Sequence, residues 1–167
     1  MKIIKKYVIT GCESEGTANS PYLTRYAFPR LGPIRMLLHV FHRSDINDMH
    51  NHPWPFVSII LWRGYIEHSR CTLCNGKGYY KKIGKIFCKY GCSACDYTGV
   101  ITKRIRPFSI NYRKAEHAHR VELINGKPAV TLVFKGARIE RPWGFYTKEG
   151  FKDFKTFFEE NGCPDYM

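Results

Sequence analysis

The sequence predicts an all-β fold, either an antiparallel sandwich or a small barrel. Short segments rich in β-branched and aromatic residues recur along the chain, and Pro and Gly separate them. Helical periodicity is confined to one late segment. The 167 residues are enough for one domain with a real core and a small inserted module. Many short strands joined by short turns are typical of sandwiches and barrels.

The expected strands are defined by their composition and by the turn residues that bound them. They cover residues 22–28, 34–41, 56–62, 65–68, 100–106, 117–124, 129–135 and 138–145. Asn125 and Gly126 lie between two of these segments and predict a hairpin turn, because both residue types tolerate positive φ. From Gly150 to Glu160, phenylalanines recur at helical spacing before an Asn-Gly stop signal. This pattern predicts a C-terminal amphipathic helix packed on the barrel.

Residues 71–99 interrupt the β pattern, which continues on both sides of them. Their composition changes abruptly to Cys, Gly, Lys and Tyr. A hairpin loop tolerates such an insertion at modest entropic cost. We therefore expect a barrel formed by residues 1–70 and 100–167, with residues 71–99 as an inserted module.

Two Cys-x-x-Cys pairs within this module predict a structural Zn²⁺ site with four thiolate ligands: Cys71, Cys74, Cys92 and Cys95. The glycines that follow each pair allow a tight turn that directs backbone N–H groups at sulfur. A site closed by four thiolates is structural, and a module this small needs the metal to fold. Cys88 leaves one alternative open, since it could pair with Cys92 at a wider spacing and leave Cys95 over.

The first half of the module, residues 71–78, resembles the Cys-x-x-Cys-x-Gly-x-Gly repeat of the DnaJ-type zinc-finger domain in full. The second half departs from it, because Tyr97 stands where the first glycine would be. The resemblance covers these residues alone, and it implies a zinc-binding fold and not a chaperone role. Cys12 and Cys163 lie far from the module and are expected to be free thiols.

The formal net charge of +13 predicts a surface that attracts anions. Within the module, lysines alternate with Tyr and Phe between residues 77 and 90, a composition that suits phosphate attraction and base stacking. Nucleic acid is therefore a candidate partner. The alternative stays open that the lysines form a solvated face and that the aromatic rings are the core of the module.

The sequence shows no sign of a membrane protein or of an exported one. No apolar run is long enough to cross a bilayer, and residues 1–7 lack the long apolar region of a signal peptide. We expect a cytoplasmic protein without a membrane partner.

Two His-x-His pairs are the strongest functional signal: His50 with His52, and His117 with His119. On a strand alternate side chains share a face, so each pair can direct two imidazoles at one place. If the two strands are neighbours in a barrel, up to four neutral nitrogen donors converge, which is what a transition metal needs. The alternative is that these histidines only satisfy hydrogen bonds within their strands.

The surroundings of the first pair resemble the cupin motifs, in which His-x-His is followed by a glycine and a further His stands in a second motif. Here a glycine follows His50 and His52, and His119 stands in the second position. The acidic residue that many cupins place after the first pair is missing, since its place falls near Phe56 or Val57. The resemblance implies His50, His52 and His119 as metal ligands, with His117 as a candidate replacement for the carboxylate.

More closely, the chain outside the insertion resembles an uncharacterised cupin-like family of bacterial and phage genomes with the RmlC-like jelly-roll fold. The segments that carry this resemblance are residues 38–45, 50–58, 64–65, 119–123 and 143–145. It implies a cupin-like double-stranded β-helix, here with a C-terminal amphipathic helix and an inserted small zinc-binding module. It also implies a metal site in the barrel, without naming a reaction.

We expect a second divalent metal at the barrel histidines, either Fe²⁺, Mn²⁺, Ni²⁺ or Zn²⁺. Such a metal suits an oxygenase, isomerase or hydrolase acting on a small polar or anionic substrate. Three arginines are candidate catalytic residues and anion clamps: Arg43, Arg120 and Arg141.

A non-catalytic alternative is a barrel that binds a ligand or nucleic acid, with the zinc module making the contact. A nuclease of the His-Asn-His type is disfavoured, because its named residues are spread over a hairpin and a helix, whereas here they are contiguous. A homo-oligomer is compatible with each of these functions.

Overall fold

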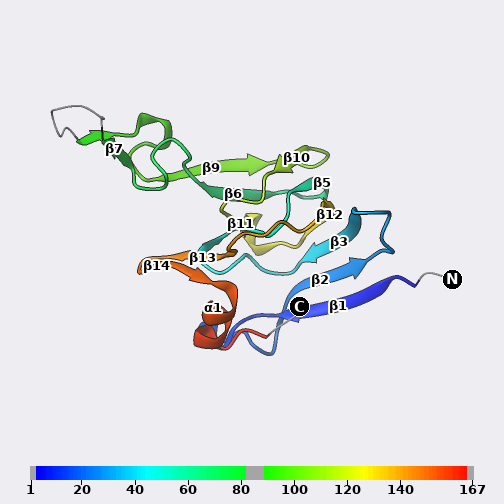
Figure 1. Cartoon of the computed structure of the whole chain (residues 1–167). Coiled ribbons are helices and arrows are strands. Elements are labelled where there is room, and N and C mark those ends of the chain that lie inside the picture. The colour runs from blue at the N-terminus through cyan, green and yellow to red at the C-terminus, as the bar shows by residue number, and fades with distance from the viewer. Residues whose placement is uncertain (1–2, 82–88, 165–167) are drawn as a thin grey trace.

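Two antiparallel sheets face each other in the computed structural model of the protein, which describes residues 3–81 and 89–164 (Figure 1). The first sheet has the described strands β1 (Lys5–Thr10), β2 (Pro21–Ala27), β3 (Arg35–Phe41), β12 (Ala129–Lys135), β5 (Phe56–Trp62) and β10 (Ile110–Arg113), in that order. The second has β14 (Gly150–Asp153), β13 (Gly144–Thr147), β4 (Met49–His50), β11 (His119–Leu123), β6 (Tyr65–Arg70) and β9 (Val100–Ile105). Strands β3, β5 and β12 lie in the first sheet, whereas β4, β6 and β11 lie in the second. The chain therefore crosses repeatedly from one sheet to the other, as in a jelly-roll barrel.

The described residues 71–81 and 89–99 extend from the end of one hairpin of the second sheet (Figure 1). Strands β6 and β9 pair in continuous register from Tyr65 opposite Ile105 to Arg70 opposite Val100. Residues 70 and 100 are thus paired neighbours at one end of this hairpin. The segment carries the short strands β7 (Tyr79–Lys81) and β8 (Lys89–Gly91) and the 3-10 turn η2 (Ser93–Cys95); two further 3-10 turns are η1 (Glu13–Glu15) and η3 (Ile124–Gly126).

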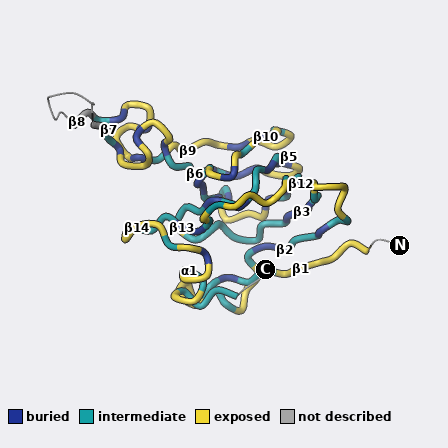
Figure 2. Tube along the Cα trace, viewed as in Figure 1, coloured by how far each residue is buried: buried dark blue, intermediate teal, exposed yellow. Residues whose placement is uncertain are grey.

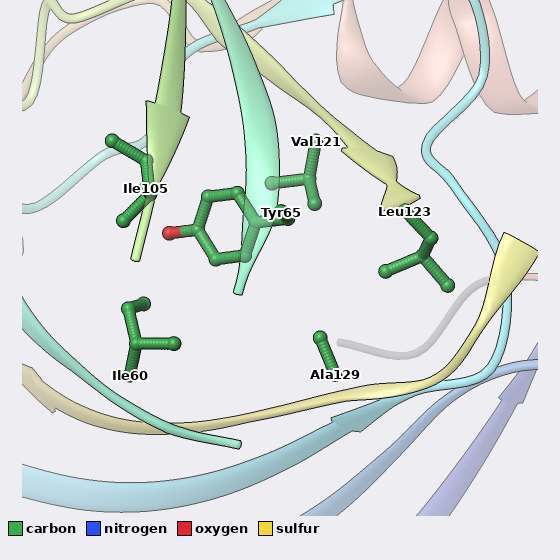
Figure 3. Close-up of a cluster of buried hydrophobic side chains, with 6 residues drawn as sticks. All are labelled: Ile60, Tyr65, Ile105, Val121, Leu123 and Ala129. Carbon is green, nitrogen blue, oxygen red and sulfur yellow. The ribbon is translucent and has the colours of Figure 1, made fainter. Parts of the chain in front are cut away.

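A cluster of apolar side chains fills the space between the two sheets (Figure 3). The first sheet contributes Ile60 and Ala129, and each member of the cluster is at most 4 % exposed. The second sheet contributes Tyr65, Ile105, Val121 and Leu123. Strands β5, β11 and β12 alternate between buried and less buried positions, as two-sided strands do, whereas the edge strand β1 is largely exposed (Figure 2). Each Å² of apolar surface removed from water stabilises the fold by about 25 cal/mol, so the more apolar face of each strand is the one that faces inward.

Helix α1 (Phe154–Asn161) packs beside β13 and is the only α-helix among the described residues. Asp153 caps it by accepting hydrogen bonds from two backbone N–H groups of the first turn. Phe154 stacks on Trp143 and Phe157 on Phe145, with ring centroids 4.0 and 3.8 Å apart. The predicted phenylalanine face is therefore in contact with the barrel. No helix in the described ranges is long and apolar enough to span a membrane.

One strand boundary and one helix boundary near the C-terminus differ from the prediction. Residues 138–143 form no strand, and β13 begins at Gly144 instead. Pro142 cannot donate a ladder hydrogen bond, and Ile139 donates its N–H to the carbonyl of Pro53 at 2.8 Å, outside any sheet. The predicted helix is wrong over residues 150–153, because these residues pair with β13 as β14.

The predicted hairpin at Asn125 and Gly126 is wrong, although both residues have the expected positive φ of 53° and 64°. The strands on either side, β11 and β12, belong to different sheets and do not pair with each other. The turn therefore carries the chain from one sheet to the other. Local turn chemistry determines the conformation of the turn but not which strands pair.

Cys12 and Cys163 form a disulfide, so the prediction that they are free thiols is wrong. The fold brings together chain segments separated by 151 residues. Beside the disulfide, the N–H of Glu13 donates to the carbonyl of Gly162 at 3.2 Å.

Strands β1 and β10 are also absent from the prediction. Most of their residues are not buried, so their sequences show little of the hydrophobic alternation that marks a strand.

Candidate metal centres

Three histidines converge at one point of the second sheet: His50 on β4, His52 two residues further, and His119 at the start of β11. Strands β4 and β11 pair with His50 opposite His119, and alternation places His52 on the same side as His50. Nε2 of His52 lies 3.1 Å from Nε2 of His119, and one ring nitrogen from each of the three lies within 4.8 Å of the others. Two nitrogens about 2.1 Å from one metal ion are about 3.0 to 3.4 Å apart in octahedral or tetrahedral geometry. The spacing therefore fits ligands of a shared ion.

Two buried carboxylates lie behind these histidines. Oδ2 of Asp45 is 4.0 Å from Nδ1 of His50, and Oε2 of Glu67 is 3.9 Å from Nδ1 of His119. Asp45 is itself held by the hydroxyl of Tyr22 and by a backbone N–H group of β11. A carboxylate on the far side of an imidazole orients the ring and makes its other nitrogen a better ligand. Both carboxylates are therefore placed to support metal binding without being ligands of the three-histidine site.

Burial keeps the imidazoles of His50 and His52 neutral. Burial lowers the pKa of His50 to about 4, although Asp45 opposes the shift, and His119 adds to it. Burial also lowers the pKa of His52 well below its usual value, and repulsion from His50, His119 and Arg25 adds to the effect. Neutral imidazole is the form that binds a metal, so both residues are in that form at neutral pH.

His117 does not join the three converging histidines. It precedes β11, and its Nε2 lies 2.8 Å from Oε1 of Glu67. Arg113 donates to both oxygens of the same carboxylate, at 2.9 and 2.8 Å. One ligand atom each of Glu67, His117 and His119 also lie within 4.8 Å of one another, so His119 belongs to both groups. The structure thus pairs His117 with Glu67.

Glu67 is not predicted from the sequence as a site residue, yet it is one of the two carboxylates beside the histidines. Burial raises its pKa, but the neighbouring His117, His119 and Arg113 outweigh burial and hold the pKa well below its usual range. One feature of the sequence could have indicated that Glu67 is buried. It lies two residues after Tyr65 in a predicted strand, so the side chains of Tyr65 and Glu67 share one face.

Phe56 occupies the place where the cupin resemblance led us to look for an acidic ligand. Its ring centroid lies 5.1 Å from that of His52 and 5.9 Å from that of His119. The acidic ligand that the cupin resemblance expected there is replaced by an apolar ring. Phe56 therefore shields the histidines on one side instead of adding a charge.

A row of polar side chains crosses the first sheet close to the histidines. Arg25, His39 and Thr131 are cross-strand partners on β2, β3 and β12. Nε of Arg25 donates to Nε2 of His39 at 3.1 Å, and both residues help to lower the pKa of His52. The hydroxyl of Thr131 and Nδ1 of His119 are buried without a hydrogen-bond partner among the described residues. Because buried polar atoms normally have partners, the hydroxyl of Thr131 points to a ligand or water in the barrel, whereas Nδ1 of His119 faces Glu67.

The three arginines predicted as anion clamps are not brought together at the histidines. Arg43 donates to two backbone carbonyl groups at 3.3 and 3.1 Å. Arg120 lies 3.4 Å from Glu122, and Arg141 lies 3.5 Å from Glu116. Arg120 directly follows His119 on β11, so alternation directs it to the other face.

The four cysteines of the Cys-x-x-Cys pairs form a second, buried cluster. The sulfurs of Cys71 and Cys92 lie 3.8 Å apart, and those of Cys74 and Cys95 lie 3.7 Å apart. All four sulfurs lie within 4.8 Å of one another, and none is in a disulfide. Four thiolates about 2.3 Å from a central Zn²⁺ are about 3.8 Å apart in a tetrahedron. The cluster has the dimensions of such a site.

Each half of the cysteine cluster directs a backbone N–H group at sulfur. Gly78 donates to Sγ of Cys74, and Gly99 donates to Sγ of Cys95, both at 3.3 Å. A Cβ on Gly99 would overlap the carbonyl of Gly76, which belongs to the other half. Glycine is therefore required where the two halves meet.

Tyr97 has the same backbone role as its counterpart Gly76. Both residues are in the left-handed region, with φ of 63° and 74°. Each donates its N–H to the carbonyl of the first cysteine of its own half, at 3.0 and 2.9 Å. The departure from the glycine repeat at Tyr97 therefore leaves the local backbone pattern intact.

Part of the module lies outside the described residues, including Lys82, Lys85, Phe87 and Cys88. The alternative pairing of Cys88 with Cys92 and the contact of the basic segment with nucleic acid both stay predictions. Among the described residues of the module, Leu73 and Tyr97 are 73 % and 66 % exposed.

Comparison with family models and with curated protein sequences gives no match for this chain. Solved structures do match. A cupin-2 domain from Rhodospirillum rubrum aligns with a TM-score of 0.56 and 7 % identity, over 88 % of this chain and 78 % of that one. A cupin domain from Bordetella pertussis aligns with a TM-score of 0.44 and 10 % identity, over 71 % and 96 %. Hydroxypropylphosphonic acid epoxidase from S. wedmorenis aligns with a TM-score of 0.45 and 9 % identity, over 78 % and 55 %.

The chain has a cupin fold, with two antiparallel sheets in a jelly-roll barrel and a C-terminal helix. This likeness, at 7 % identity, shows the fold alone. The reaction has to be inferred from the residues of this chain.

Proposed function

We propose that the protein is a metal-dependent cupin enzyme that acts on a small anionic substrate. In this proposal His50, His52 and His119 hold a divalent metal ion, either Fe²⁺, Mn²⁺, Ni²⁺ or Zn²⁺. The observation that carries it is the convergence of three imidazoles, of which His50 and His52 are kept neutral by burial, with a carboxylate behind the rings of His50 and His119.

The residues around the histidines have separable roles in this proposal. A bound divalent metal supplies a Lewis acid that polarises a substrate oxygen or acidifies a bound water. Asp45 and Glu67 orient the ligand rings, and Phe56 excludes water from one side. The guanidinium of Arg25, buried nearby without a carboxylate partner among the described residues, favours an anionic substrate.

We further propose that Cys71, Cys74, Cys92 and Cys95 hold a structural Zn²⁺. Supporting observations are the sulfur spacing of 3.7 to 3.8 Å and the two N–H groups directed at sulfur. The shell is closed by four ligands, so the ion would stabilise the module without a catalytic role.

A second candidate function is ligand binding without turnover. The observation that favours it is Phe56, which leaves the three-histidine site without a carboxylate ligand. Measured turnover of any substrate that depends on the barrel metal would exclude this candidate.

Elemental analysis after anaerobic purification tests the proposed function. We expect two metal ions per chain, one lost in a His50→Ala, His52→Ala double variant and the other in a Cys71→Ser, Cys74→Ser double variant. His68→Ala is the matched control, because His68 pairs with Glu122 and is not part of the cluster. A single zinc per chain that is unchanged in the His50→Ala, His52→Ala variant would overturn the proposal.

A further inference from the structure

A cavity of about 270 Å³ lies where β3 begins and β12 ends. We call it the cationic pocket and define it by the five lining residues that matter here: Arg30, Arg35, Trp54, Lys135 and Arg138. The lining residues that the structure describes include no Asp or Glu. Four cations around a small cavity without a counter-charge define a place that attracts anions.

The strand register forces two of these cations together. Lys135 and Arg35 are direct cross-strand partners in the antiparallel pair of β12 and β3. Like charges in that position destabilise a sheet. Burial lowers the pKa of Lys135 to about 8, and repulsion from Arg25, Arg35, Arg30 and Arg138 adds to the effect. None of these five cations has an ion pair with a carboxylate of the described residues, so the repulsion is not relieved within the described chain.

Arg35 offers a second, independent sign of a missing ligand. Its Nε is buried and has no hydrogen-bond partner among the described residues. An unpartnered buried donor costs on the order of 1 to 3 kcal/mol, and more when it is charged. A bound anion would accept this hydrogen bond and would also lie among the positive charges.

Trp54 and Arg25 connect the cationic pocket to the metal histidines. Nζ of Lys135 lies 3.5 Å from the centroid of the Trp54 ring, and the same ring is stacked with His52, at a centroid distance of 6.3 Å. Arg25 lies close enough to both groups to lower the pKa of Lys135 and of His52. A ligand anchored in the pocket is therefore next to the proposed reaction centre.

We infer that the cationic pocket binds a phosphate group of a small substrate, an inference that rests on the proposed function. A phosphate group carries a charge of about −1.5 to −2 at neutral pH and has three acceptor oxygens, so it can be shared among several guanidinium groups. A carboxylate carries one charge and two oxygens, and leaves more of the repulsion uncompensated. The cavity is slightly smaller than the range of about 300 to 1,000 Å³ typical of sites for drug-sized ligands, so it suits one charged group of a small molecule.

Calorimetric titration with inorganic phosphate and with acetate tests this inference on the full-length, metal-loaded protein. The pocket variant is Arg35→Gln, Lys135→Gln. The control is Arg104→Gln, Lys155→Gln, which removes the same two charges from exposed positions on β9 and α1. We expect phosphate to bind the wild type and the control within about twofold of each other, and the pocket variant at least about tenfold more weakly. Acetate should bind the wild type at least about tenfold more weakly than phosphate.

Thermal unfolding gives a second readout that does not depend on measurable heat. Without phosphate, the pocket variant should melt at or above the wild-type temperature, because two opposed like charges are gone. With phosphate, the wild type and the control should gain stability while the pocket variant gains little. If the net charge of the protein alone attracted phosphate, the two variants would bind it equally well. Equal phosphate affinity in all three proteins would therefore overturn the inference. An absence of phosphate binding to the wild type would also overturn it.

The metal content of the same preparations separates this inference from the proposed function. Barrel metal without selective phosphate binding would overturn the pocket alone. Selective phosphate binding in a protein whose histidines hold no metal would overturn the proposed function and leave the anion site standing.

Discussion

Oε1 of Glu67 accepts a hydrogen bond from Nε2 of His117 at 2.8 Å, and this histidine does not share the ligand group of His50 and His52. We therefore expect a His117→Asn variant to keep its barrel metal, with an affinity reduced by at most about tenfold to a hundredfold through the loss of support for the site. A His119→Asn variant should lose the metal. Metal titration of both proteins checks this, and equal loss in the two would make His117 a ligand.

Replacement of Glu67 by Gln should destabilise the fold by about 3 kcal/mol, because the largely buried Arg113 loses its carboxylate partner. Urea denaturation measures the effect. Glu122→Gln is the control: Glu122 is 42 % exposed and pairs with His68, so we expect a loss below about 1 kcal/mol. Similar losses in the two variants would argue against a buried ion pair at Glu67.

The stability of the metal-free protein should fall as the pH decreases from about 6.5 toward 4. Burial lowers the pKa of His50 to about 4, and burial with repulsion from Arg25 and Lys135 lowers the pKa of His39 well below its usual value. In the unfolded chain both residues take up a proton near pH 6.5. The unfolded state therefore binds more protons in this range, so acid favours unfolding.

Urea denaturation at pH 8, 6.5 and 5 measures this dependence. In a His39→Gln variant the free energy of unfolding should fall less steeply with decreasing pH. The difference from the wild type should be up to about 1.4 kcal/mol for each pH unit below 6.5. A wild-type stability that does not change between pH 8 and 5 would contradict the predicted shifts.

A Cys88→Ser variant should retain the zinc of the module, because the described cluster already provides four sulfurs at tetrahedral spacing. Cys92→Ser should lose the ion. A chromogenic zinc chelator, added to both variants under native conditions, reports which one releases metal. Release from Cys88→Ser would support the alternative pairing of Cys88 with Cys92.

Loss of the Cys12–Cys163 disulfide should lower the free energy of unfolding by up to about 4 to 5 kcal/mol, because the bond closes a loop that spans 151 residues of sequence. Urea denaturation with and without a phosphine reductant should show this difference in the wild type. A Cys12→Ala, Cys163→Ala variant should be insensitive to the reductant. A wild type that does not respond would contradict the disulfide.

Local spacing explains which parts of the candidate sites could be predicted from the sequence. His50 with His52, and each Cys-x-x-Cys pair, need only the geometry of one strand or one turn to bring two ligands together. The strands of the barrel are similarly visible where one face is buried, as in β5 and β12. The two Cys-x-x-Cys pairs do come together as one cluster, whereas of the second His-x-His pair only His119 joins His50 and His52.

Register between distant strands explains what could not be predicted. Glu67 reaches His117 and His119 because β6 pairs with β11, and the opposition of Arg35 and Lys135 depends on β3 lying beside β12. No spacing within one segment reports such neighbours. The same limit applies to Asn125, whose turn conformation was predictable while the sheet of the following strand was not.

The N–H of Cys71 donates to the carbonyl of Gly99 at 2.8 Å, directly beyond the last paired residues of β6 and β9. At its junction with the barrel the module therefore keeps its two chain ends close together, as a tight turn would. Gain or loss of such a segment during evolution would change neither the strand register nor the position of Glu67 three residues before Arg70. The barrel and the inserted module are thus free to acquire substitutions independently, with one hairpin end as their shared boundary.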